Sequence, residues 1–221
     1  MLLRLGPSTV DVFERALVVA VLPPVEDESM AAAVAHAVAE GADVVEVPGD
    51  AVELAATVPV AVRTPDAVAA GAAFAAGAVL ALDPSGFADP GYLPEAVVAG
   101  ASVVGAVPVE DADEVVPAVR ALARQATSAG VPADHVAVEP VAPAGQPVAL
   151  PRAPAVRCAG VPVLVSCLRP DAGGGPDPGA VAGPLSVAVV RGCGLLRVAA
   201  ADVRSARRVA DVIAAVRRGR A

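Results

Sequence analysis

Residues 58–86, VPVAVRTPDAVAAGAAFAAGAVLALDPSG, contain one complete unit of the pattern that organises the chain. The runs Val58–Val62 and Ala78–Leu82 are short and continuously apolar, as expected for parallel strands that are buried on both faces. Pro65–Ala76 between them is rich in alanine and has helical character. Gly77 stands where a glycine commonly ends a helix before a strand begins. The stretch therefore predicts a strand, a helix and a second, parallel strand.

The same alternation recurs along the 221 residues. The expected strands are Ala16–Leu22, Asp43–Val47, Val58–Val62, Ala78–Leu82, Ser102–Val107, His135–Val138, Val161–Val165 and Gly194–Val198. The expected helices are Asp27–Glu40, Pro65–Ala76, Asp111–Ala129, Pro178–Arg191 and Asp202–Arg217, with weaker ones at Ala51–Ala56, Tyr92–Val98 and Ala149–Cys158. Eight such units joined by right-handed crossovers predict an α/β protein, a single-domain (β/α)8 TIM barrel with trimmed loops over residues 1–221. A doubly wound open sheet is the alternative fold.

Composition and charge exclude several classes of protein. The chain has 16 basic and 24 acidic residues and a net charge of −8, whereas a nucleic-acid-binding protein needs a basic face. The longest uncharged apolar stretch, Ala67–Leu82, is too short for a membrane span. Asp11, Glu14 and Arg15 precede the first apolar run, unlike in a signal peptide, and the three cysteines lack CxxC spacing. We therefore expect a cytoplasmic protein with reduced cysteines that binds neither nucleic acid nor membranes.

The chain contains neither lysine nor asparagine, and all 16 of its basic residues are arginine. Alanine, valine, glycine, proline and arginine replace related residue types throughout, which is typical of a very GC-rich coding sequence. A residue that is required for chemistry is expected to survive such a bias. The absence of both residue types therefore limits the reactions that the protein can perform.

Charged residues stand where most of the predicted strands end. TIM-barrel enzymes carry their binding and catalytic groups at this end of their strands. Six candidates fall at or soon after an apolar run: Glu46, Arg63, Asp83, Glu139, Arg169 and Arg197. The arginines suit an anion and the carboxylates a polar ligand, but the two sets could instead pair with one another, because buried charges require partners. The sequence leaves both arrangements open.

Other polar features fit structural roles better than functional ones. Gly173–Gly175 lacks the lysine and the spacing of a phosphate-binding loop. His36 falls inside a predicted helix and His135 at the start of a predicted strand, so neither is placed at the barrel mouth, and no metal site is predicted. Cys167 has no base near it in the sequence and is a weak candidate nucleophile.

Segments along nearly the whole chain resemble, in order, the motifs of dihydropteroate synthases, the pterin-binding barrel family. They are Glu40–Gly49, Val58–Thr64, Ala76–Gly86, Val138–Pro140, Val161–Arg169 and Arg191–Val198. They are similar to the family's EGAdiiDvGG, vPvSvDT, aGAdiiNDvsG, DPG, xPvLvGxSRK and rGAxilRvHDv motifs, in that order. The resemblance implies a barrel fold and an enzyme that joins a dihydropterin pyrophosphate to p-aminobenzoate with release of pyrophosphate.

The resemblance also implies roles for particular side chains. In the family, Asp and Asn recognise the pterin ring, a Lys holds the pterin and p-aminobenzoate, and an Arg, a His and an N-terminal Asn with Mg²⁺ handle the pyrophosphate. Asp83, Arg169 and Arg197 match the family outright, and Glu46 and Glu139 keep the charge of an Asp. Ala20 replaces the N-terminal Asn, Arg63 an Asp, Leu82 the ring-binding Asn, Pro170 the Lys, and Ala199 and Ala200 the His and Asp.

These departures predict a degenerate, dihydropteroate-synthase-like barrel that has lost catalysis and acts as a binding or interaction protein linked to folate or pterin metabolism. We assign no catalytic residue and expect no metal or cofactor, with Mg²⁺ needed only if the family activity is retained. The expected ligand is a pterin or another small anion at the six strand-end residues. Two alternatives stay open: an active dihydropteroate synthase, and a purely structural partner of a full-length homologue.

The resemblance further implies an oligomer, because dimers of the family form through helices near the C-terminus. The matching helices here are Pro178–Arg191 and Asp202–Arg217. They predict a homodimer or an association with a homologue. Val203, Val209, Val212, Ile213 and Val216 form an apolar stripe that we expect to face the barrel first and a partner second.

Overall fold

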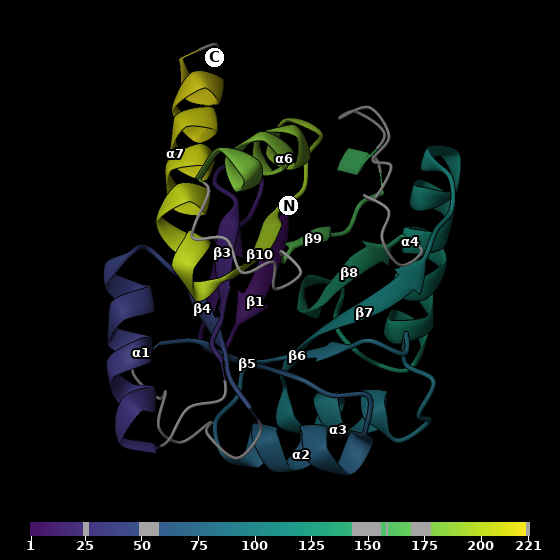
Figure 1. Cartoon of the computed structure of the whole chain (residues 1–221). Helices are drawn as coiled ribbons and strands as arrows, with labels where there is room; N and C mark the ends of the chain where they lie inside the picture. The colour runs from purple at the N-terminus through teal and green to yellow at the C-terminus, as the bar shows by residue number, and fades with distance from the viewer. Residues whose placement is uncertain (24–26, 49–57, 143–155, 158, 169–177, 220–221) are drawn as a thin grey trace.

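The computed structural model describes residues 1–23, 27–48, 58–142, 156–157, 159–168 and 178–219. Within them, eight parallel strands form one sheet that curls into a nearly closed barrel with helices around it (Figure 1). The strands are β3 (Leu17–Val21), β4 (Val44–Glu46), β5 (Val60–Arg63), β6 (Leu80–Asp83), β7 (Ser102–Pro108), β8 (Val136–Val141), β9 (Leu164–Cys167) and β10 (Leu195–Ala199). Neighbours follow the order β8-β7-β6-β5-β4-β3-β10-β9. The predicted (β/α)8 barrel is confirmed.

The strands at the two ends of this order, β8 and β9, meet and close the barrel. Val138 and Val163 form an isolated parallel bridge, and the Val138 amide donates a hydrogen bond to the Pro162 carbonyl at 3.0 Å. Closure brings the C-terminal ends of strands that are distant in sequence to one rim. The side chains at those ends can then meet across the barrel mouth.

The helices around the barrel follow the sequence closely. They are α1 (Asp27–Ala39), α2 (Ala67–Ala75), α3 (Tyr92–Ala99), α4 (Ala112–Ser128), α6 (Pro178–Val190) and α7 (Val203–Arg218). Asp111 and Glu114 form a capping box at the start of α4, and Gly100 ends α3 with a φ of 62°. The weaker helix expected at Ala51–Ala56 and most of that at Ala149–Cys158 lie outside the described residues. None of the described helices is long and apolar enough to cross a membrane.

Several strands extend further toward their C-termini than the sequence predicts. β5 includes Arg63, β6 includes Asp83, and β8 continues through Glu139 to Val141. The predicted strands stop at the last apolar residue, whereas the backbone ladder depends on main-chain hydrogen bonds and continues through charged side chains. As a result, three of the candidate residues lie in the strands themselves and are held by the sheet.

An N-terminal hairpin, which the sequence pattern does not predict, covers the opposite end of the barrel. Its strands are β1 (Leu2–Leu5) and β2 (Ser8–Asp11). Leu3 and Leu5 are buried in the same apolar cluster as the inward-facing residues of the barrel. The Ser102 hydroxyl, at the start of β7, donates a hydrogen bond to the Arg4 carbonyl at 2.6 Å. The hairpin therefore closes the N-terminal end of the barrel and leaves the C-terminal end as the mouth.

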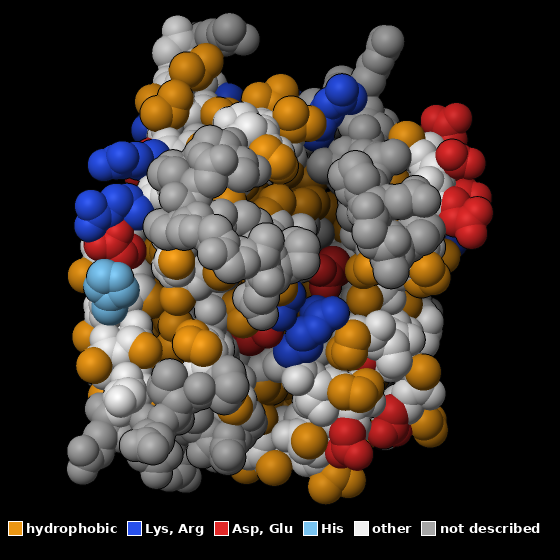
Figure 2. Space-filling model, viewed as in Figure 1, with side chains coloured by type: hydrophobic (Ala, Val, Ile, Leu, Met, Phe, Trp, Pro, Cys, Tyr) orange, Lys and Arg blue, Asp and Glu red, His pale blue; other side chains and the backbone are white. Residues whose placement is uncertain are grey.

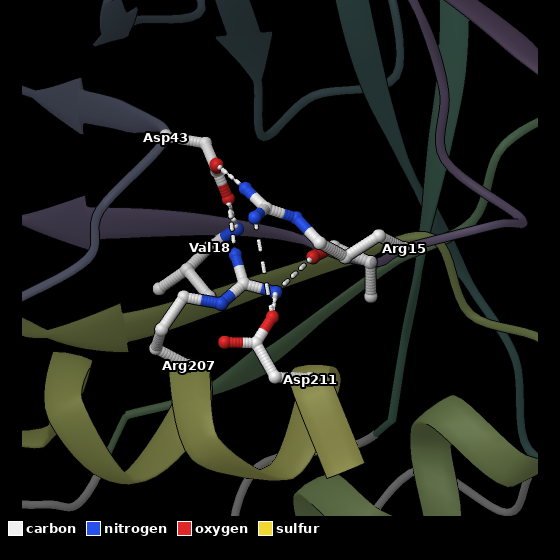
Figure 3. Close-up of polar contacts among 6 residues, drawn as sticks. Arg15, Val18, Asp43, Arg207 and Asp211 are labelled. Atoms are coloured by element: carbon white, nitrogen blue, oxygen red, sulfur yellow. Dashed lines mark hydrogen bonds and ion pairs between the residues drawn. The ribbon is translucent and has the colours of Figure 1, made fainter. Parts of the chain in front are cut away.

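Helix α7 is tied to the N-terminal side of the barrel by polar groups around Asp43 (Figure 3). Asp43, directly before β4, accepts hydrogen bonds from the Val18 amide at 2.8 Å, from Arg207 Nη1 at 2.8 Å and from Arg15. Arg207 of α7 also pairs with Asp211 one turn further on, at 3.0 Å. These contacts join α7, β3 and β4 at the end of the barrel that lies away from the mouth.

Candidate functional site

Five polar side chains lie on the inner face of the barrel at its mouth. Side chains two residues apart in a strand share a face, and each of the five follows a residue of the inner apolar cluster by two positions. The inner residues are Val44, Ala61, Ala137, Leu164 and Leu195, and the polar residues that follow them are Glu46, Arg63, Glu139, Ser166 and Arg197. The mouth therefore forms a polar layer directly above an apolar core.

Arg197 and Glu46 form the most buried ion pair of this layer. Arg197 Nε and Nη2 donate to the two carboxylate oxygens of Glu46 at 2.6 and 2.5 Å, and both side chains are buried. Burial opposes the charge on Arg197, but the hydrogen bonds and charge of Glu46, together with the charge of Glu139, outweigh it and raise the pKa of Arg197. The pair is a bidentate, charge-assisted contact between β4 and β10.

Glu139 connects this pair to Arg63 on the other side of the mouth. Arg63 Nη1 donates to Glu139 Oε2 at 3.0 Å, and the Ser166 hydroxyl donates to Glu139 Oε1 at 2.5 Å. Arg197 Nη1 in turn donates to the Ser166 oxygen at 3.3 Å. The side chains therefore form a continuous chain from Glu46 to Arg63 in which two positive charges face two negative ones.

Asp83 is not part of this network. Its neighbour Leu82 belongs to the inner apolar cluster, so Asp83 lies on the other face of β6. Its carboxylate accepts hydrogen bonds from the Ser85 amide and hydroxyl at 2.7 and 2.6 Å and from the Phe87 amide at 2.7 Å. Phe87 has a φ of 64°, which is costly for a residue with a side chain, so Asp83 stabilises a strained turn between β6 and α3.

The remaining candidates from the sequence are placed as follows. Arg169 lies outside the described residues. Cys167 is half-buried, and burial raises the pKa of its thiol, the opposite of what activates a cysteine nucleophile. His135 lies before β8, at the N-terminal end of the barrel, with its ring Nδ1 3.3 Å from the Ala101 carbonyl oxygen. Among the described residues, no group of three or more His, Cys, Asp or Glu side chains could hold a metal ion.

The four described charges of the mouth thus pair with one another. Figure 2 shows basic and acidic side chains together near the middle of the face viewed there. Ser166, which joins the two pairs, is absent from the candidates chosen on charge. The period of two from Leu164 could have found it, because that period places Ser166 on the inner face of β9.

No model of a known protein family matches the sequence, and no curated protein does. Solved structures match closely. Dihydropteroate synthase from Thermus thermophilus, in complex with 6HMPPP, matches with a TM-score of 0.74 and 26% identity over 98% of this chain and 100% of that one. The Burkholderia cenocepacia enzyme, complexed with 7,8-dihydropteroate, matches with a TM-score of 0.77 and 23% identity over 99% of this chain and 97% of that one. Yersinia pestis dihydropteroate synthase matches with a TM-score of 0.79 and 18% identity over 99% of each chain. The chain is a dihydropteroate-synthase-like barrel.

The match spans nearly the full length of both chains, so the resemblance first noted in short motifs extends to the whole fold. In this dihydropteroate-synthase-like barrel, Glu46, Arg63, Glu139 and Arg197 meet at the mouth, and Asp83 holds the turn after β6. Their assignment as ligand-binding residues stays a prediction, because fold similarity does not test individual side chains.

The buried pair generates a prediction about stability. Arg197→Ala leaves Glu46 buried without its counter-charge, so we expect the free energy of unfolding to fall by about 3–5 kcal/mol. Arg204→Ala removes an arginine that is 63% exposed from its pair with Glu40; it is the control and should change the free energy of unfolding little. Urea denaturation followed by circular dichroism measures both. Similar losses for the two variants would contradict the assigned role of the mouth pair.

Proposed function

We propose that this barrel has lost dihydropteroate synthesis and acts as a binding or interaction protein linked to folate or pterin metabolism. The observation that carries the proposal is the self-pairing of the mouth. Arg63 stands at a position where the resemblance places a ring-recognising Asp, and its guanidinium pairs with Glu139, which stands at another Asp position of the family. An acidic pair that would face a ligand is thereby replaced by an ion pair within the chain.

A second line of support comes from side chains that the reaction needs and that this chain lacks. Leu82 stands at the position of the ring-binding Asn, is buried and packs in the inner apolar cluster. A pterin edge placed against it would lose its hydrogen bonds, at a cost of about 1–3 kcal/mol for each unpaired group. The sequence contains no lysine or asparagine that another position could supply.

The position matched to the N-terminal Asn gives further support. The resemblance assigns the handling of pyrophosphate to an Arg, a His and an N-terminal Asn with Mg²⁺, and Ala20 stands at the Asn position with a methyl side chain. Mg²⁺ binds through oxygen ligands, which a methyl group cannot provide. Ala20 therefore does not fit the metal, and we assign Mg²⁺ no step.

The exposed valines of α6 and α7 support an association with a second copy or a homologue. Val187 and Val190 of α6 and Val212 and Val216 of α7 are exposed on helices that pack against each other (Figure 1). Of the predicted stripe, Val203 is buried against the barrel, so the stripe divides between the core and the surface. We propose that the exposed valines form the contact with a second copy or a homologue, because apolar surface on adjacent helices favours burial.

The loss of catalysis is tested by turnover. The purified chain with 7,8-dihydropterin pyrophosphate, p-aminobenzoate and Mg²⁺ should release no pyrophosphate above the background of a sample without protein. Dihydropteroate synthase from Thermus thermophilus, assayed in parallel, shows that the assay detects activity. Release of pyrophosphate that depends on both substrates would identify the chain as an active synthase and reject the proposal.

The proposed association is tested by sedimentation. Val212→Asp places a charge on the exposed face of α7 and should shift the chain from dimer to monomer, with a dissociation constant raised at least about tenfold. Val98→Asp, at the most exposed valine of α3, is the control and should leave the mass unchanged. A wild-type chain that sediments as a monomer at micromolar concentration, and that does not co-elute with an active synthase, would rule out the association.

A further inference from the structure

The two ion pairs of the mouth differ in how firmly they are held. All three guanidinium nitrogens of Arg197 donate hydrogen bonds, two to Glu46 and one to Ser166, and the side chain is 7% exposed. Arg63 is 29% exposed and, among the described residues, uses Nη1 alone, in one contact with Glu139. Displacing Arg63 therefore breaks one hydrogen bond and moves a side chain that already contacts solvent.

The other half of the Arg63 contact is rigid. The Glu139 side chain is 5% exposed, it projects from the middle of β8, and its Oε1 atom is fixed by the Ser166 hydroxyl. A buried carboxylate is costly without a cationic partner, and a planar guanidinium presents N–H donors that fit it. The Oε2 side of Glu139 is thus a preformed acceptor for such a group, and a side chain of the same molecule fills it.

The charges of the mouth favour a cation over an anion as the group that can enter. An anion at Arg197 would compete with Glu46, and the displaced carboxylate would remain buried without a partner. A cation that replaces Arg63 at Glu139 leaves each buried charge neutralised, because the arginine that leaves can extend into solvent. This comparison favours a cation at Glu139, whereas the sequence analysis expects an anion at Arg197.

We propose that Arg63 is an internal occupant of a guanidinium-binding site at Glu139, and that a ligand with a guanidinium or amidinium group binds there by displacing it. The proposal deepens the proposed function and rests on it, because it needs a mouth that binds and does not catalyse. Competition with Arg63 lowers the apparent affinity in proportion to the small fraction of molecules in which Glu139 is free. A free small molecule and an arginine side chain of a protein partner offer the same group.

Calorimetry on Arg63→Ala tests the proposal. Methylguanidinium, titrated at millimolar concentrations that do not unfold proteins, should bind Arg63→Ala at least about tenfold more tightly than the wild type. Methylammonium carries the same charge without the planar donors and should show no such gain. Adding Glu139→Gln to Arg63→Ala should abolish the gain. Agmatine and acetyl-arginine amide are titrated in the same way. Tighter binding of agmatine indicates a free amine-bearing ligand, and tighter binding of acetyl-arginine amide indicates an arginine side chain of a protein partner.

Two results for Arg63→Ala would overturn the proposal. A folded Arg63→Ala that binds methylguanidinium no more tightly than the wild type, or whose gain survives Glu139→Gln, excludes the site. If Arg63→Ala does not fold, Arg63→Gln replaces it with the same expected order of affinities. Turnover of the wild type is a separate measurement, so a failure of this proposal and a failure of the proposed loss of catalysis are distinguishable.

Discussion

The requirement that a buried charge be neutralised governs the mouth of this barrel. Arg197 in the middle of β10 and Glu46 at the end of β4 are 151 residues apart in sequence, and the burial of each depends on the charge of the other. Their pairing fixes the polar layer above the apolar interior, and Ser166 extends it to Glu139. The second arginine, Arg63, then completes the neutralisation. On the inner face of such a mouth every described charge is paired, so a ligand can be held there only by displacing one of the partners.

The two ends of the barrel are covered by different kinds of interaction. At the N-terminal end, the hairpin of β1 and β2 inserts Leu3 and Leu5 into the interior, so apolar burial covers that opening. At the C-terminal end, described side chains of the strands themselves meet, and they form ion pairs across the opening. In TIM barrels this end carries the functional groups, so a change in its side chains alters function while the fold below remains intact.

The sequence predicts the architecture of this chain better than its site. The continuous apolar runs and the glycines that end helices suffice for the eight strands, because parallel strands buried on both faces have few alternatives. The Leu2–Asp11 hairpin is not predicted, although the Gly6-Pro7 pair is a turn signal, because its strands are too short to show a pattern. Charge alone groups Asp83 with Glu46, whereas the period of two along β6 separates them. The strand order around the closed barrel decides which carboxylate pairs with which arginine. A single sequence does not reveal these pairings.

The central claim is that the mouth of a dihydropteroate-synthase-like fold is occupied by its own charges. The most direct test is a calorimetric titration of the wild-type chain with 7,8-dihydropterin pyrophosphate in the presence of Mg²⁺. We predict no heat of binding at millimolar ligand, because Leu82 offers no hydrogen bond and the pairs of Glu46 with Arg197 and of Glu139 with Arg63 already satisfy one another. Saturable binding in the micromolar range would contradict the claim and show that the mouth still accepts the pterin.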